Sequence, residues 1–352
     1  MKYSGIIPGL LVILAALALG AVLQATSSVI MPLVIALLLS FVLSPLVETL
    51  VRTHVPRIAA IIIVILGLLG VGVLIGRILY TSINSLVQSW SIYQGRVLGL
   101  YAQVTNLLHL PSNILSQPNV TRSIGGYAVN FFGDFLKFMG SLTLVIIFVL
   151  FLLLEKPFLR AKLIDAIEGP KTETVVRVLH QVTEQVGRYL TIKLLVSAAV
   201  GLTIWLSFGV IGIDFAFVWG VLSFLFNFVP AFGSLAVGLV GVLFAVTQYL
   251  PNWTPIIEAG IAVAAVQILF GSILEPLLQG DNLNLSPVVL LFSLLIWGWL
   301  WGLMGMLLSV PLTVALKIAL GSIPRTRFVS VLMGTGNSRE HSGSSREQTG
   351  GS

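Results

Sequence analysis

The stretch that decides the fold reads Gly271-Ser-Ile-Leu-Glu275-Pro276, then Gly280-Asp281-Asn282-Leu-Asn284-Leu-Ser286-Pro287, and continues as an apolar run to Pro311. It places a carboxylate, two prolines and a polar link between two strongly apolar segments. In water this link would be an ordinary loop. In a membrane it brings a carboxylate and unpaired backbone to the edge of the hydrocarbon, where such groups are rare and usually functional.

The composition is that of a membrane protein. Of the 352 residues, 57% are hydrophobic and 9% are charged, whereas soluble domains carry about 25% charged residues. Apolar stretches recur from end to end, so we expect an all-α, polytopic bundle of transmembrane helices. The absence of cysteine excludes a disulfide framework and a thiolate metal site. No basic stripe with interleaved aromatic residues is present, so we expect no nucleic-acid partner.

About eight apolar segments are candidate spans. They are residues 6–23, 29–47, 58–77, 138–154, 194–211, 215–247, 256–274 and 287–316. The sixth and eighth are too long for one straight crossing, since about 20 residues suffice. Each contains a Pro or Gly break and is therefore a kinked helix, a re-entrant hairpin or two short spans. Each also follows a shorter span, as an internal repeat would require, although the two copies share little residue-level similarity.

The basic residues set the expected orientation. Eight crossings leave only Arg77, Arg96, Arg122 and Lys137, of 19 Lys and Arg residues, on one side. The positive-inside rule assigns the other side, with both termini, to the cytoplasm. This topology puts the link from Glu275 to Ser286 near the outer face.

The same topology divides the chain into functional regions. They are N-terminal transmembrane helices (1–77), an extracytoplasmic helical hairpin (78–137), a C-terminal transmembrane transport region (138–332) with a cytoplasmic amphipathic segment (155–193), and a disordered tail (333–352). Apolar residues from Leu79 to Leu107 follow a period of 3.5, which predicts a helix packed on another helix, within the hairpin or in a neighbouring subunit. The stripe within 155–193 predicts an interfacial helix with a solvated charged face, Lys193 lying near the headgroups.

The break in the sixth segment reads Asn227-Phe-Val-Pro230-Ala-Phe-Gly233. Pro230 removes a backbone donor and frees the carbonyl of Phe226, while Gly233 tolerates a close backbone approach. The ends of a broken helix can coordinate an ion or a polar solute; the alternative is a packing kink satisfied by neighbouring helices. Asn227 favours a functional break, because an amide at this depth needs a partner.

Further polar residues extend this candidate pathway. Glu275 is either a proton or cation site or a carboxylate that reaches the interface. Gln267 either lines the pathway or bonds a neighbouring helix. The predicted pathway comprises Asn227, Pro230, Gly233, Gln267, Glu275, Pro276, Gly280, Asn284 and Pro287. The predicted helix-packing residues, beside three tryptophans, are Gly302, Gly305 and Pro311.

Signatures of enzymes are missing from the sequence. It contains no Walker A, HExxH or GxSxG motif. Its four histidines are scattered without metal-ligand spacing. We therefore predict no catalytic residue, no metal site and no cofactor.

Several motifs together carry a family resemblance. They are Gly187-Arg188-Tyr189-Leu190, the Asn227–Gly233 motif, the segment from Glu275-Pro276 to Gly280, Leu285-Ser-Pro287, and Trp299-Leu-Trp301-Gly302-Leu-Met-Gly305-Met-Leu-Leu-Ser-Val-Pro311-Leu. On these residues the region 185–320 resembles the autoinducer-2 exporter-like family of bacterial transporters; over 1–184 only the hydropathy layout agrees. Family members often have an aromatic residue and a proline where this chain has Ala231 and Ser234. The resemblance implies a multi-pass, oligomeric inner-membrane transporter and does not name its cargo.

We therefore expect a secondary transporter that exports a small polar solute or signalling molecule across the bacterial inner membrane, coupled to H⁺ or Na⁺. Its partners would be that solute, the lipid bilayer and further copies of the chain in a homo-oligomer. The alternative is an oligomeric membrane scaffold or channel-like protein without gradient-coupled transport.

Overall fold

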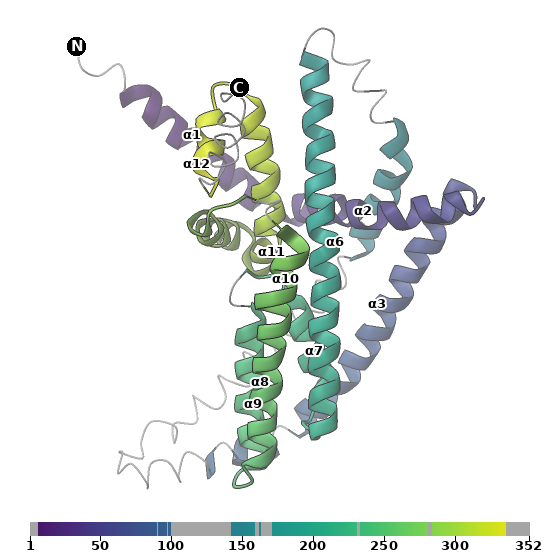
Figure 1. The fold of residues 1–352 in the computed structure, drawn as a ribbon, viewed down its shortest axis with the longest axis vertical. Helices are drawn as coiled ribbons and strands as arrows, with labels where there is room; N and C mark the ends of the chain where they lie inside the picture. Colours follow the sequence, from purple (N-terminus) through teal and green to yellow (C-terminus); the bar gives the residue numbers. More distant parts are fainter. Residues whose placement is uncertain are drawn as a thin grey trace, which may run out of the picture. The chain divides into compact units, whose positions relative to one another are not determined.

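The structure is a computed structural model. It describes residues 6–89, 91–96, 98–99, 142–158, 162, 171–230, 233–280 and 284–335. The regular elements within these ranges are all helical (Figure 1), as the predicted fold class requires. Most of the predicted outer hairpin, the region 100–141, lies outside the described residues, as does the tail beyond residue 335.

The helices follow the apolar segments closely. They are α1 (Ile6–Ala25), α2 (Ser27–Arg52), α3 (Arg57–Gln88), α6 (Lys171–Ile211), α7 (Ala216–Phe226), α8 (Gly233–Tyr249), α9 (Thr254–Val266), the π-helix η1 (Gln267–Leu274), α10 (Glu275–Gln279), α11 (Pro287–Ser322) and α12 (Arg327–Leu332). Residues 142–158 are also helical. By length and composition, 5 helices of the described chain can cross a membrane, and α7 and α8 are shorter apolar helices.

The chain forms two compact units, each built from segments that are distant in sequence. The first unit comprises residues 1–53, 147–192 and 279–352, and the second comprises 54–146 and 193–278. The core of the first unit joins α2, the first half of α6, the link before α11 and the second half of α11. Its buried residues are Leu38, Val186, Tyr189, Leu190, Leu285, Val310 and Val314.

Helix α6 corrects the interpretation of residues 155–193. The sequence predicted an interfacial helix followed by a separate span, but Lys171–Ile211 form one helix of 41 residues (Figure 1). Val186 and Tyr189, from the predicted interfacial stripe, are buried in the core of the first unit. An apolar stripe indicates that one face is covered, and either lipid or protein can cover it.

The sixth apolar segment is a helical hairpin. Helix α7 has 11 residues and is about 17 Å long, too short to cross a hydrocarbon core of about 30 Å. It packs against α8. At the end of α8, the Tyr249 hydroxyl and the Gln248 side-chain amide both donate to the carbonyl of Gly212, at 2.6 and 2.9 Å. The hairpin therefore returns to the end of α6 from which it started.

Tyr93 contacts the end of the second unit where α6 and α8 both end. Its hydroxyl donates to the Asp214 carboxylate at 2.5 Å, and its ring packs near those of Phe215 and Phe244. Burial, reinforced by the bond to Asp214, raises the pKa of Tyr93 above its usual value. Because Tyr93 belongs to the predicted outer excursion, this end of the hairpin is the predicted outer end.

The eighth apolar segment also folds back on itself. The backbone of α11 is not helical at Trp301 and Gly302, where Gly302 has φ 61° and ψ −142°. Across this bend the Trp297 indole N–H donates to the Thr313 hydroxyl at 3.2 Å, whereas 16 residues of straight helix would separate them by about 24 Å. Beyond the second half, Lys317 Nζ donates to the carbonyl of Asn284, just before the first. The two ends of this hairpin therefore meet as well.

The α7–α8 hairpin corrects the expected position of Glu275. Eight single crossings would place Lys193 and Glu275 at opposite faces of the membrane, but their side chains form an ion pair. They meet if the sixth segment, α7 with α8, returns to the side from which it entered. The prediction that Glu275 lies at the membrane face opposite Lys193 is therefore wrong. The predicted orientation of the termini is unaffected, because two returning segments replace two crossings.

Candidate functional site

An ion pair joins α6 to the start of α10 in the second unit. The Lys193 ammonium donates to Glu275 Oε1, and the two side chains are 5% and 20% exposed. Charges taken this far from water are unfavourable unless they are paired. Each residue therefore depends on the other, and a change in the charge of either one acts directly on the contact between the two helices.

A second polar pair lies one turn further along α6. The Asn227 amide donates to the hydroxyl of Ser197 at 2.9 Å, and these residues are 6% and 0% exposed. Ser197 follows Lys193 by four residues, so both occupy one face of α6. On α7, the hydroxyl of Ser223 is buried without a hydrogen-bond partner in the described chain. A buried polar group of this kind calls for water or a ligand.

A third polar pair joins α8 to η1. The Ser234 hydroxyl donates to the Gln267 side-chain carbonyl at 3.0 Å. Gln267 opens the π-helix, which runs for 8 residues and ends directly before Glu275. Such segments are rare and often mark functional positions. Asn227 and Ser234 flank the break between α7 and α8, so the two sides of the break contact different helices.

The break itself is a tight turn. A Cβ on Gly233 would lie 1.7 Å from the carbonyl oxygen of Phe226, so the backbone approach excludes any larger residue. The sequence predicted that Pro230 frees this carbonyl, but the Val229 N–H donates to it at 2.8 Å. The polar groups that the break offers are therefore the side chains around it rather than an open helix end.

The predicted pathway residues divide between the two units. Asn227, Pro230, Gly233, Gln267, Glu275 and Pro276 belong to the second unit, and Gly280, Asn284 and Pro287 belong to the first. Pro276 is the second residue of α10. Gly280 follows that helix with φ 55°, and Pro287 is the first residue of α11. The backbone carbonyl of Asn284 accepts a hydrogen bond from Lys317 Nζ.

The predicted helix-packing residues lie within the α11 hairpin. A Cβ on Gly302 would meet nothing within 4 Å, so the positive φ of this residue, not close packing, requires glycine. A Cβ on Gly305 would lie 1.8 Å from the carbonyl oxygen of Trp297. Pro311 is buried in the second half of the hairpin. Gly302 thus permits the bend of α11, and Gly305 permits the close approach of its two halves.

Sequence reasoning missed the partners on α6. Lys193 was grouped with the charges of the 155–193 segment, although Ile192 and Leu194 flank it and its side chain is buried. A lone cation inside an apolar helix, followed four residues later by Ser197, is the signal that could have identified this face. Ser223 and Ser234 give weaker signals, because single serines are common in membrane helices.

Broken apolar hairpins with interhelical polar pairs define a polytopic membrane protein with a polar site among its helices. A sequence model described as AI-2E family transporter matches residues 11–325. The chain belongs to this family, which confirms the resemblance and extends it over nearly the whole sequence.

Three relatives illustrate the family. The chain is 30% identical over 286 residues to the AI-2 transport protein TqsA of Escherichia coli (strain K12), covering 79% of this chain and 81% of that protein. It is 32% identical over 219 residues to a putative transport protein of Borreliella burgdorferi, covering 62% of this chain and 60% of the relative. It is 34% identical over 162 residues to the putative transport protein YhhT of Escherichia coli (strain K12), covering 46% and 45%.

Proposed function

We propose that this protein is a secondary transporter that exports a small polar solute or signalling molecule and couples export to H⁺ or Na⁺. Family membership supports a role in membrane transport rather than catalysis. The observation that carries the proposal is the ion pair between buried Lys193 and partly buried Glu275. Ionisable residues inside a membrane protein usually belong to ion or substrate pathways.

The ion pair offers a physical coupling step. A proton or Na⁺ that binds the Glu275 carboxylate competes with the Lys193 ammonium for the same oxygens. Occupation of the carboxylate would leave Lys193 as a buried charge without compensation, which is strongly unfavourable. The contact between α6 and α10 would then loosen. Ion binding would in this way select a second arrangement of the helices.

The polar groups near this pair could receive the solute. Asn227 and Ser197 are buried, and the hydroxyl of Ser223 has no partner in the described chain. A small molecule with hydroxyl or carbonyl groups could exchange hydrogen bonds with them without leaving a buried group unsatisfied. This chemistry suits a polar solute better than a lipid-like one. Ala231 and Ser234, where the family pattern differs, could alter which solute fits.

The two hairpins support alternating access. In chain order, α6 precedes the α7–α8 hairpin, and α9 with η1 and α10 precedes the α11 hairpin. With returning hairpins, these two blocks have opposite orientations in the membrane. Inverted repeats with broken helices are typical of secondary transporters. We further propose that the protein lies in the inner membrane with both termini in the cytoplasm and acts as a homo-oligomer.

The decisive experiment is transport by purified protein in liposomes. We would measure Na⁺/H⁺ exchange and solute efflux, including autoinducer-2 as one test solute because the relative TqsA is named for AI-2 transport. Glu275→Gln should abolish gradient-coupled flux. Glu258→Gln, which changes an exposed glutamate of α9, should leave it intact.

A double variant separates mechanism from folding. Glu275→Gln leaves the buried Lys193 unpaired and can destabilise the fold, whereas Lys193→Gln combined with Glu275→Gln removes both charges and should restore stability. Restored stability without coupled flux supports the proposal. Wild-type flux in the double variant would exclude the pair from the mechanism. Cross-linked oligomers that carry no coupled flux would favour a scaffold or channel-like protein.

A further inference from the structure

A polar cavity lies within the first unit, apart from the coupling residues. Its volume is about 710 Å³, and residues of α6, α11 and α12 and the link before α11 line it. Two of its lining residues, Arg177 and Lys317, are cationic. The remaining polar lining residues are Thr174, Gln181, Gln185, Asn284, Ser322 and Ser330. No acidic side chain is among the lining residues that the structure describes.

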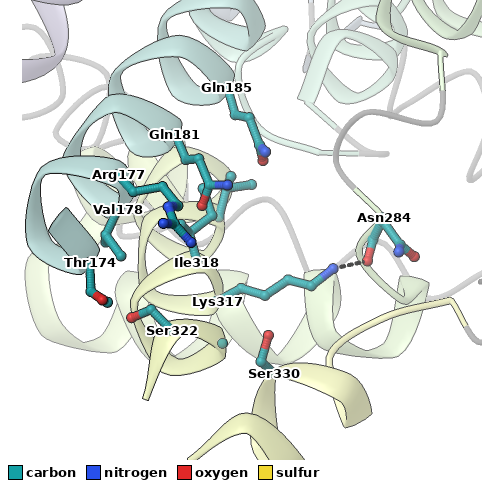
Figure 2. Close-up of a pocket in the computed structure, with 12 residues that line it drawn as sticks. Thr174, Arg177, Val178, Gln181, Gln185, Asn284, Lys317, Ile318, Ser322 and Ser330 are labelled. Carbon is teal, nitrogen blue, oxygen red and sulfur yellow. Dashed lines mark hydrogen bonds between the residues drawn. The ribbon is translucent and has the colours of Figure 1, made fainter. Parts of the chain in front are cut away.

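The two cations come from different helices that line the cavity. Figure 2 shows the side chain of Arg177 projecting from α6, while that of Lys317 extends from α11 toward Asn284. A guanidinium group presents a planar fork of donors that matches the oxygens of a phosphate or carboxylate. An ammonium group adds a compact charge. The two together suit a ligand with an anionic head.

Hydrogen bonds join the link before α11 to the residues that follow α12, and so fix one wall of the cavity. The side-chain carbonyl of Asn284 accepts hydrogen bonds from the backbone N–H and the hydroxyl of Thr335, at 3.0 and 2.6 Å. The Ser286 N–H donates to the carbonyl of Met333 at 3.0 Å. Val314, 1% exposed, connects the cavity to the core of the unit. This wall is therefore formed by the folded unit, whereas Arg177 and the other polar residues of α6 reach the cavity from an exposed face of that helix.

We propose that this cavity binds a small phosphate ester that carries several hydroxyl groups. The volume lies within the range of about 300–1,000 Å³ that is usual for small-molecule sites and exceeds what a lone phosphate needs. Arg177 and Lys317 would hold the phosphate, and the amides and hydroxyls would bind the rest of the molecule. Arg177 belongs to the predicted cytoplasmic segment, so the ligand would arrive from the cytoplasm. The headgroup of an anionic lipid shares this chemistry and must be distinguished by experiment.

Calorimetry on the full chain in phosphatidylcholine nanodiscs tests the proposal without any transport assay. Ribose 5-phosphate is the probe, ribose is its neutral match, and inorganic phosphate is the competitor. We expect saturable binding of the ester, competition by phosphate and no binding of ribose. Arg177→Gln should weaken binding about 10- to 100-fold, because it removes a charge-assisted hydrogen bond. Arg188→Gln, an exposed change on the same helix, should not.

Three results would overturn the proposal: no saturable binding of the ester, equal binding of ribose, or equal losses in the two arginine variants. Repeating the titration with phosphatidylglycerol in the nanodiscs identifies the physiological source. Inhibition by this lipid that requires Arg177 would assign the cavity to a lipid headgroup. Unchanged binding would assign it to a soluble ester. The result is independent of the coupled-flux experiment, so the two proposals can fail separately.

Discussion

Buried hydrogen bonds between single residues hold the candidate site together. Asn227 is 6% exposed, and its amide donates to Ser197, which is fully buried. A buried donor that loses its acceptor retains the full cost of having left water, about 1–3 kcal/mol. Residues at this site therefore contribute to stability and to solute binding through the same atoms.

Ser197→Ala should lower the free energy of unfolding by about 1–3 kcal/mol, because it leaves the Asn227 amide buried and unpaired. Thermal unfolding in detergent, followed by circular dichroism, measures the change. Ser207→Ala is the matched control: it lies on the same helix and is partly buried. Equal effects of the two substitutions would show that the bond between Ser197 and Asn227 contributes nothing specific.

Half of each polar pair was predictable from the sequence. Asn227, Gln267 and Glu275 stand out because they interrupt apolar segments. Their partners Ser197, Ser234 and Lys193 did not, because a partner is defined by packing between helices that are distant in sequence. Spacing along one helix places residues on a common face, but it does not identify the helix they meet.

Glycines set the contacts between and within the helices. A Cβ on Gly201 of α6 would lie 2.7 Å from the carbonyl oxygen of Gly220 on α7, and the reverse substitution gives 2.7 Å as well. The two helices thus cross in direct backbone contact. Small residues at such crossings are typical of membrane proteins, where close packing replaces the hydrophobic effect between helices.

Gly201→Ala should separate α6 from α7 and destabilise the protein by about 1–3 kcal/mol, the usual cost of overpacking. Gly209→Ala, on the same helix, introduces a Cβ whose nearest neighbour is 4.0 Å away, so it should have little effect. Thermal stability and the monodisperse fraction in size-exclusion chromatography provide the comparison. A Gly201→Ala protein as stable as the control would contradict the crossing.

At the bend of α11, a substitution of Gly302 separates the effect of backbone conformation from that of packing. Neither Gly302 nor Gly67 of α3 has an atom within 4 Å of an added Cβ, but only Gly302 has a positive φ. Gly302→Ala should therefore cost about 1–3 kcal/mol through backbone strain. Gly67→Ala should be neutral or slightly stabilising, because alanine favours a helix interior. Equal stability of the two variants in thermal unfolding would argue against the bend.

For the whole molecule, hydropathy predicted the segments better than the path of the chain. The apolar segments and the breaks in the sixth and eighth were evident from sequence. Their return to the starting side was not, because hydropathy records depth in the membrane and not direction. The decisive contacts, Tyr249 with Gly212 and Trp297 with Thr313, join residues whose spacing gives no signal. The same limitation misplaced Glu275.

Two positions report on the direction of the α7–α8 hairpin, and the chain has no cysteine to interfere. Single crossings put Asn252 in the cytoplasm and Asp281 outside, whereas a returning α7–α8 hairpin exchanges the two sides. In spheroplasts, a membrane-impermeant maleimide should therefore label Asn252→Cys at once and Asp281→Cys only after permeabilisation. Thr26→Cys and His54→Cys serve as the outer and cytoplasmic controls, because both topologies place them identically. The reverse labelling of Asn252→Cys and Asp281→Cys would refute the returning α7–α8 hairpin, and with it the inverted arrangement on which the proposed alternating access depends.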